Sequence, residues 1–184
     1  MTRWYEDIVI DEVFHLGEHE FTEPDIIAFA QQYDPQYFHT DPEAANAGPF
    51  GGLVASGWHT ACVGQYLFIT RLEAEKEKII AAGEEPGISG PSPGVNTMDF
   101  KTPVRPGDTV RYELKVTSKR PSKSLPGWGV MIHDFRAFNQ RDELVFVEEL
   151  AAFLRMRDYK MPLKMRLGMA LMKLPGSKAL LGRR

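Results

Sequence analysis

Cysteine is almost absent from this 184-residue chain: Cys62 is the only one, so no internal disulfide bond can form. A single thiol is typical of a reducing compartment, which predicts a cytoplasmic protein. Long apolar runs are also missing, and without about 18 consecutive apolar residues we expect no transmembrane segment. The charged opening segment, residues 1–7, has no apolar signal region. The net charge of −3 argues against nucleic acid as a general partner, because such binders are usually strongly basic.

The composition supports a folded domain rather than a disordered chain. Apolar residues make up 43% and charged residues 26%, enough to bury a core beneath a charged surface. Charge is uneven along the chain: residues 155–184 hold nine Lys or Arg and one acid, so they carry +8 and leave −11 for the rest. Five of the eight methionines lie in the same segment. We therefore predict a domain over residues 1–157 and a basic, Met-rich, helical tail over residues 158–184.

Hydrophobic periodicity divides the domain into two kinds of segment. Apolar positions three or four residues apart predict helices, and strict alternation predicts strands. Thr22 is a candidate N-cap, and the proline that follows Asp34 ends the first helix. The expected helices cover residues 22–33, 42–45 and 56–80, and the expected strands cover residues 13–21, 95–101, 109–119, 128–138 and 144–156.

This order of elements predicts an α+β fold of the hot-dog type, in which an antiparallel sheet wraps around one long helix. Residues 58–69 are apolar on most sides, which predicts that the first half of the long helix is buried. A single sheet of this kind leaves one edge strand and one end of the helix open. We therefore expect the chain to pair as a homodimer or a dimer-based oligomer.

Asp34 and His39 lie five residues apart in a proline-interrupted loop. A carboxylate and an imidazole suit proton transfer near neutral pH, because partial burial can tune their pKa values. The alternative is that Asp34 only ends a helix and that His39 is a hydrogen-bonded loop residue. The pair alone favours this structural interpretation.

The glycine-rich segment from Phe50 to Trp58 leads directly into the long helix. Ser56 can cap the helix, which leaves the N–H of Gly57 unpaired at the positive end of the helix dipole. A glycine lets a ligand oxygen approach such an N–H closely, so the group could stabilise an oxyanion. The alternative is that the glycines only permit tight turns and close packing.

Together these motifs resemble the MaoC-like dehydratases, whose best-known members are the (R)-specific enoyl-CoA hydratases. The resemblance covers residues 10–157 and depends on five segments in order: residues 22–30, 34–41, 44–45, 50–60 and 103–108. It implies that Asp34 and His39 are catalytic and that the Gly57 N–H is the oxyanion donor. The further residues expected at the substrate site are Phe50, Gly51, Gly52, Ser56 and Trp58. The chain departs from the usual hydratase pattern, because Gln36 and Tyr37 replace Asn and Pro, and Ser56 replaces His.

The activity that the resemblance implies is the reversible hydration of 2-enoyl thioesters, or the dehydration of (R)-3-hydroxyacyl thioesters. Coenzyme A or the phosphopantetheine of an acyl carrier protein would carry the acyl group, and no metal or redox cofactor is needed. Two alternatives remain: an acyl-thioester hydrolase on the same fold, and a non-catalytic subunit that binds acyl thioesters.

Several other side chains have a structural interpretation. His15 and His19 lie in a predicted strand, where this spacing does not form a metal pair. We expect His59 to be packed and hydrogen-bonded, His133 to be structural and Cys62 to be inert core. The basic residues near strand ends could contact coenzyme A phosphates or be scattered surface charges; they are Lys101, Arg105, Lys119, Arg120 and Lys123.

The basic tail, residues 158–184, allows three interpretations. It could lie on an anionic membrane surface, or it could bind an acidic partner such as an acyl carrier protein. We favour a third possibility, in which the tail folds back on its own acidic domain or on the dimer mate, because opposite charges attract.

Overall fold

A computed structural model describes residues 3–160 and 162–163. The predicted tail over residues 158–184 therefore falls almost entirely outside the described residues. The strands are β1 (Val13–Phe21), β2 (Gly94–Phe100), β3 (Asp108–Pro121), β4 (Trp128–Phe138) and β5 (Leu144–Arg155). The helices are the 3-10 helix η1 (Tyr5–Asp7), α1 (Glu23–Tyr33), α2 (Tyr37–Thr40), α3 (Pro42–Asn46) and α4 (Gly57–Ala81).

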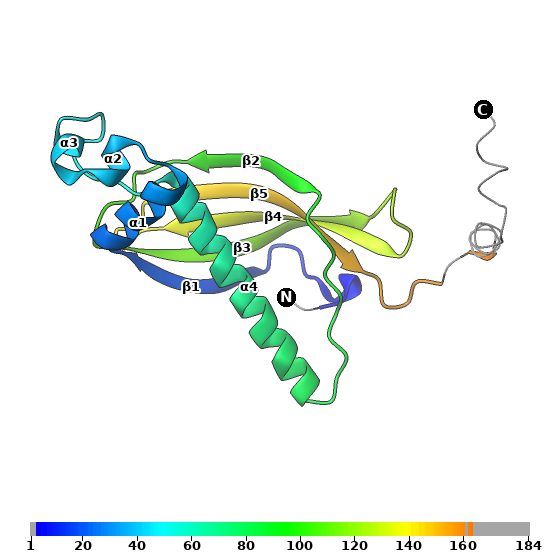
Figure 1. The fold of residues 1–184 in the computed structure, drawn as a ribbon. Helices are drawn as coiled ribbons and strands as arrows, with labels where there is room; N and C mark the ends of the chain where they lie inside the picture. The colour runs from blue at the N-terminus through cyan, green and yellow to red at the C-terminus, as the bar shows by residue number, and fades with distance from the viewer. Residues whose placement is uncertain (1–2, 161, 164–184) are drawn as a thin grey trace, which may run out of the picture.

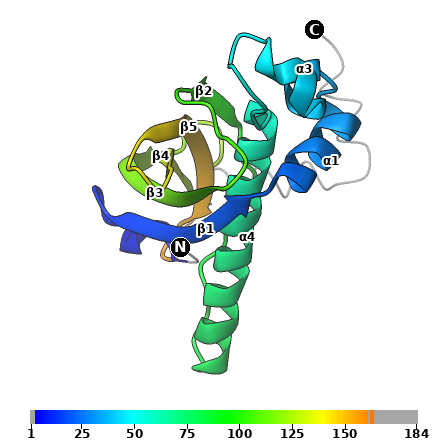
Figure 2. The same ribbon diagram turned by 90° about the vertical axis from the view of Figure 1, so that its left-hand side faces the viewer.

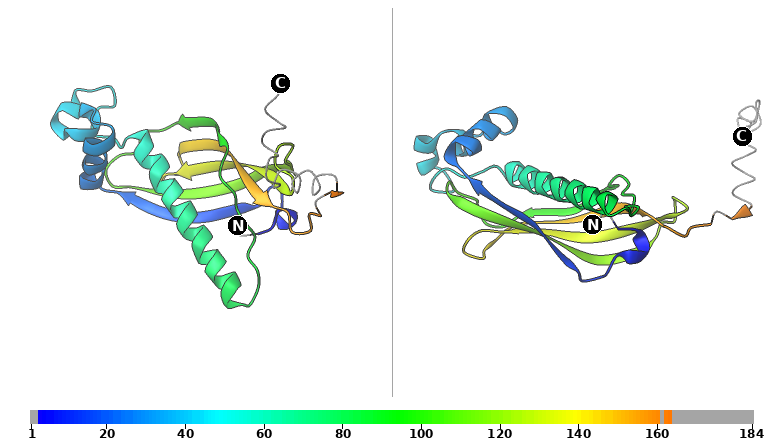
Figure 3. Two further views of the ribbon diagram at one scale, coloured as in Figure 1. Left: turned by 45° about the vertical axis from the view of Figure 1, so that its right-hand side comes forward. Right: turned by 90° about the horizontal axis from the view of Figure 1, so that it is seen from below.

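The five strands form one antiparallel sheet in the order β1-β3-β4-β5-β2. The long helix α4 lies across one face of this curved sheet, and its C-terminal half extends past the β1 edge (Figures 1 and 2). The short helices α1, α2 and α3 gather beside the start of α4 (Figure 3). This arrangement confirms the predicted α+β hot-dog fold.

The core lies between α4 and the sheet. Alternate residues of β3 are buried and point toward the helix; they are Val110, Tyr112, Leu114 and Val116. At the middle of α4, a Cβ on Gly64 would lie 2.8–2.9 Å from ring carbons of Phe135 and Tyr112. The glycine therefore lets the helix backbone pack directly on two aromatic rings of the sheet.

Helix starts follow the predicted caps. The hydroxyl of Thr22 accepts the N–H of Asp25 at 3.3 Å, and the hydroxyl of Ser56 accepts the N–H of Trp58 at 3.2 Å. Each hydroxyl satisfies a backbone donor that has no partner within its own helix. Among the described helices, none has both the length and the hydrophobicity needed to cross a membrane.

The prediction that the first half of α4 is buried on most sides is wrong for the single chain. Trp58 is 57% exposed and Tyr66 is 70% exposed, and Cys62, predicted to be core, is exposed as well. These residues are four apart and share the helix face away from the sheet. One sheet covers only one side of a helix, so the outer apolar stripe lies open in this chain.

Candidate active site

The structure brings Asp34 and His39 together at the junction of α1 and α2. The distance from Asp34 Oδ2 to His39 Nε2 is 3.5 Å. The predicted loop at this point is wrong in one respect, because residues 37–40 form the short helix α2. That single turn carries His39 back toward the end of α1, where Asp34 is the C-cap.

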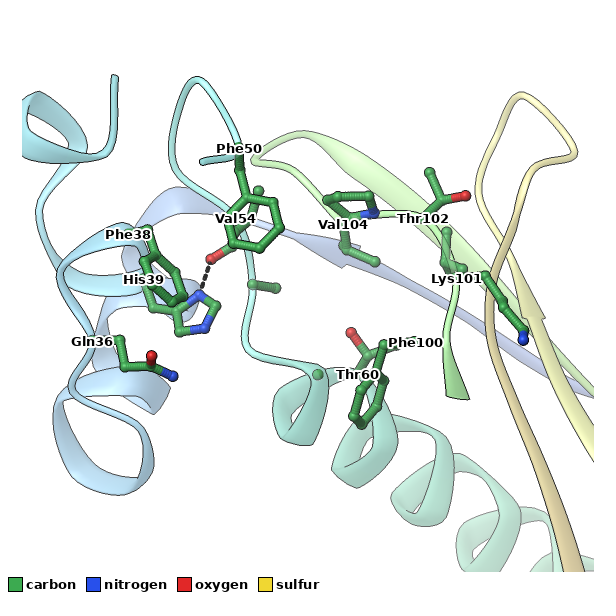
Figure 4. Close-up of a pocket in the computed structure, with 14 residues that line it drawn as sticks. Gln36, Phe38, His39, Phe50, Val54, Thr60, Phe100, Lys101, Thr102 and Val104 are labelled. Carbon is green, nitrogen blue, oxygen red and sulfur yellow. Dashed lines mark hydrogen bonds between the residues drawn. The ribbon is translucent and has the colours of Figure 1, made fainter. Parts of the chain in front are cut away.

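The second ring nitrogen of His39 determines how the imidazole is held. His39 Nδ1 lies 2.7 Å from the carbonyl oxygen of Val54, and the ring is almost fully buried (Figure 4). A carbonyl oxygen only accepts, so Nδ1 carries the proton and donates a hydrogen bond to the carbonyl of Val54. In the neutral ring, Nε2 is therefore a bare acceptor that faces the carboxylate of Asp34.

Two hydrogen bonds hold the carboxylate of Asp34 in its charged form. Its Oδ2 accepts the hydroxyl of Ser56 at 2.7 Å, and its Oδ1 accepts the amide of Gln36 at 2.8 Å. Burial raises the pKa of Asp34, but the hydrogen bonds from Ser56 and Gln36 and the interaction with His39 outweigh that effect, so the pKa lies below its ordinary value. Asp34 is thus ionised at neutral pH. Ser56 acts here as the partner of Asp34 and the cap of α4.

Gly57 is the first residue of α4, and its N–H has no acceptor among the described residues. The ring of Phe100, from the end of β2, packs against its Cα: a Cβ at Gly57 would lie 2.7 Å from three ring carbons. Gly57 and Phe100 both border the same cavity, so the aromatic ring narrows the approach to the helix start without filling it. Any residue larger than glycine at this position would force the ring of Phe100 to move.

The cavity next to His39 has a volume of about 380 Å³ and a mostly apolar wall (Figure 4). Of the predicted substrate residues, Phe50 lies in this wall together with His39 and Gly57. Gly51 and Gly52 shape the preceding turn with positive φ angles of 60° and 147° and lie outside the wall. Ser56, Trp58 and the catalytic candidate Asp34 also lie outside it, so His39 is the member of the Asp34–His39 pair that borders the cavity. The remaining wall residues are Gln36, Phe38, Val54, Ala55, Thr60, Phe100, Lys101, Thr102, Pro103, Val104 and Val145.

Comparison with known proteins identifies the family. The model of the MaoC-like domain matches residues 9–126. The chain belongs to the MaoC-like domain family. It is 31% identical to YdeM of Bacillus subtilis (strain 168) over 150 residues, which cover 82% of this chain and 97% of YdeM.

Solved structures share the MaoC-like fold. A MaoC-like dehydratase from Rhodospirillum rubrum is 31% identical, with a TM-score of 0.65 over 87% of this chain and 99% of that one. The (R)-hydratase from A. caviae is 22% identical, with a TM-score of 0.56 over 82% of this chain and 98% of that one. At 22% identity the second likeness shows the fold alone.

One wall of the MaoC-like cavity comes from the turn before β3, which we did not predict to line the site. The N–H of Ala55 donates to the carbonyl of Val104 at 2.8 Å, which joins this turn to the segment before α4. Asp108 holds the turn in place, since its carboxylate accepts the N–H of Arg105 at 2.8 Å and the amide of Gln140 at 2.8 Å. The turn motif at residues 103–108 is the sequence signal that could have indicated this part of the cavity wall.

Two of the remaining polar candidates, Lys119 and His59, have structural roles in this MaoC-like domain. Lys119 is not a free cation, because its ammonium group donates to the carbonyls of Tyr5, Glu6 and Ile8 at 2.6–3.2 Å. His59 is packed as predicted, stacked on Phe29 at 4.4 Å, but its Nδ1 lacks the predicted hydrogen bond to any residue that the structure describes.

The strand histidines do not come together as a pair. His15 faces Glu113 at 3.5 Å, whereas His19 packs edge-on against Phe21 at 4.9 Å. The described residues contain no group of three or more His, Cys, Asp or Glu side chains placed to hold a metal ion.

Proposed function

We propose that this protein catalyses the reversible hydration of 2-enoyl thioesters, or the dehydration of (R)-3-hydroxyacyl thioesters. One observation carries the proposal: Asp34 Oδ2 faces His39 Nε2 at 3.5 Å, and the Nδ1–H of His39 is anchored on the Val54 carbonyl at 2.7 Å. An ionised carboxylate and a bare imidazole nitrogen can hold one water molecule between them and accept its proton.

The reaction needs a proton-transferring pair beside the double bond and a hydrogen-bond donor at the thioester oxygen. As the water oxygen bonds to C3, one member of the Asp34–His39 pair takes a water proton, and electrons move from the double bond toward the thioester oxygen. The Gly57 N–H, at the positive end of α4, would stabilise the resulting enolate. The proton then passes from the pair to C2, so the hydration consumes one water and releases nothing.

The cavity wall suits an acyl chain attached to a pantetheine arm. Phe38, Phe50 and Val104 give apolar surface to the cavity that His39 borders. Lys101 brings a positive charge to the same wall, where it pairs with Asp99 at 2.9 Å. The carrier would be coenzyme A or an acyl carrier protein, and this chemistry requires no metal or redox cofactor. The MaoC-like dehydratase of Rhodospirillum rubrum, at 31% identity, supports a dehydratase or hydratase activity.

A homodimer is part of this proposal. The exposed apolar face of α4, which includes Trp58 and Tyr66, lies on the same side of the sheet as the ring of Phe100 on the edge strand β2. A second copy could cover both the helix face and the open edge. Light scattering that gives the mass of one chain across a range of concentrations would contradict the dimer.

A panel of thioesters separates the proposed activity from its two alternatives. Purified protein is mixed with crotonyl, medium-chain and branched 2-enoyl coenzyme A, and the enoyl absorbance and free thiol are followed together. A hydratase removes the absorbance without releasing thiol. Release of thiol would instead identify a hydrolase. If the absorbance stays constant, no thiol appears and substrate analogues still raise the melting temperature, the protein is a non-catalytic binder.

A further inference from the structure

A second cavity, of about 170 Å³, lies between the middle of α4 and the sheet. Phe68 and Leu72 of the helix form one side, and Met131 and Leu154 of the sheet form the other. It shares no lining residue with the cavity at His39. The helix packs tightly on Phe135 and Tyr112 at Gly64, which lies between the two cavities along α4.

His133 is the unusual residue of this second cavity. The ring is fully buried and borders the cavity, and neither Nδ1 nor Nε2 has a hydrogen-bond partner among the described residues. Buried polar groups in proteins are nearly always hydrogen-bonded, because an unpaired one loses its hydration without compensation. Burial also lowers the pKa of His133 to about 4, so the ring is neutral at physiological pH.

The other residues of the cavity wall give His133 neither an opposite charge nor a hydrogen bond. The wall contains no Asp, Glu, Lys or Arg, and most of it is aliphatic or aromatic. The other polar side chains in the wall are Gln65, Ser89 and Ser92, and none of them is hydrogen-bonded to His133. The hydroxyl of Ser92 already donates to the carbonyl of Ala151 at 2.7 Å. The site is therefore an apolar space with an imidazole that is free to pair.

We propose that this cavity is a binding site for a small, neutral, apolar molecule that carries one hydroxyl group, and that the hydroxyl pairs with His133. A hydroxyl both donates and accepts, so it matches the imidazole in either tautomer. A charged ligand would lose its hydration and find no opposite charge in the wall. The volume suits a six-membered ring, because an engineered apolar cavity of about 150 Å³ in another protein binds benzene.

Phenol and benzene are matched probes for this site, since they differ by one hydroxyl group. Each is titrated into the full-length protein, and the imidazole ¹⁵N resonances of His133 are followed by NMR. We expect both to bind, phenol about two- to tenfold more tightly than benzene, which is the usual gain from one hydrogen bond. Phenol should also move the ¹⁵N resonance of His133 further than benzene does.

Two variants test the location. His133→Phe should remove the preference for phenol, whereas the same substitution at the exposed His15 should leave it unchanged. Ala152→Leu should weaken binding of both probes by filling the cavity. The proposal is overturned if neither probe binds, if phenol binds no tighter than benzene, or if the phenol preference survives in His133→Phe. The ¹⁵N measurement on the unaltered protein decides the question even if a variant fails to fold.

Discussion

Two buried histidines show how differently one fold can treat the same side chain. In α2, His39 is 6% exposed; its Nδ1 donates a hydrogen bond to the Val54 carbonyl at 2.7 Å, and its Nε2 faces the carboxylate of Asp34 at 3.5 Å. In the middle of the sheet, His133 is fully buried, and neither of its nitrogens has a hydrogen-bond partner within the described part of the chain.

The difference lies in the backbone around each ring rather than in the depth of burial. His39 lies where α1, α2 and the segment before α4 meet. Two acceptors are available to its ring there: the carbonyl of Val54, in that segment, and the carboxylate of Asp34, the C-cap of α1. His133 lies in the middle of β4, where the sheet ladder with β3 and β5 uses the backbone groups and the facing side chains are apolar. An imidazole therefore keeps acid–base capacity at the junction and becomes a neutral polar group in the sheet.

The largest effect should come from removing the charge that faces His39. Asp34→Asn keeps the shape of the side chain but cannot accept a proton, so hydration of crotonyl coenzyme A should slow by about 10²–10⁴-fold. Asp11→Asn is the matched control, because Asp11 is an exposed acid paired with Lys115 at 2.8 Å. Melting curves should show that both variants fold. Full activity of Asp34→Asn would contradict the assignment of Asp34 and His39 as the catalytic pair.

The packing at the start of α4 can be tested with Gly57→Ala. The added methyl group would collide with the ring of Phe100, and overpacking of this kind costs about 1–3 kcal/mol of stability. Phe100→Ala combined with Gly57→Ala should recover most of that loss, which urea unfolding of the four proteins of the double-mutant cycle would measure. Strictly additive losses would mean that the ring does not limit this position.

His133 should make the protein sensitive to acid. The unfolded chain protonates His133 near pH 6.5, but the folded chain does so only near pH 4, so stability is lost as the pH falls through that window. This one residue should account for about 2 kcal/mol between pH 7 and pH 5. His133→Phe should have a shallower pH dependence of unfolding than the unaltered protein. His59 has the same direction of pKa shift and remains in both proteins.

The smallest effect concerns the support of Asp34. Ser56→Ala removes the cap of α4, which costs about 1 kcal/mol, and it removes a donor that lowers the pKa of Asp34. The acid limb of the rate profile should therefore move to higher pH, because Asp34 is then protonated more easily. Ser56→Thr keeps the hydroxyl and should retain the original profile. An unmoved acid limb in Ser56→Ala would show that this hydrogen bond does not tune the carboxylate.

Local signals in the sequence predicted those features that depend on neighbouring residues. Thr22 and Ser56 cap helices as expected, because a cap needs only its own hydroxyl and the next few N–H groups. The Asp34–His39 pair came from the resemblance to the MaoC-like dehydratases, and the structure brings the two side chains together through a short helical turn that the sequence analysis did not predict.

Features that depend on distant segments were missed. The sequence did not indicate that the carbonyl of Val54 would accept a hydrogen bond from His39, or that Phe100 would cover Gly57 from a distant strand. It also placed Cys62 in the core, although the single sheet leaves that face of α4 open. The three carbonyls around Lys119 come from a segment more than 100 residues away.

By itself, the sequence determined the order of helices and strands, the helix caps and the residue types available for proton transfer, because these follow from periodicity and short-range hydrogen bonding. The tertiary structure alone decided which histidine gained partners and which lost them. Burial and pairing depend on the segments that meet around a side chain in space, and those segments are far apart along the chain.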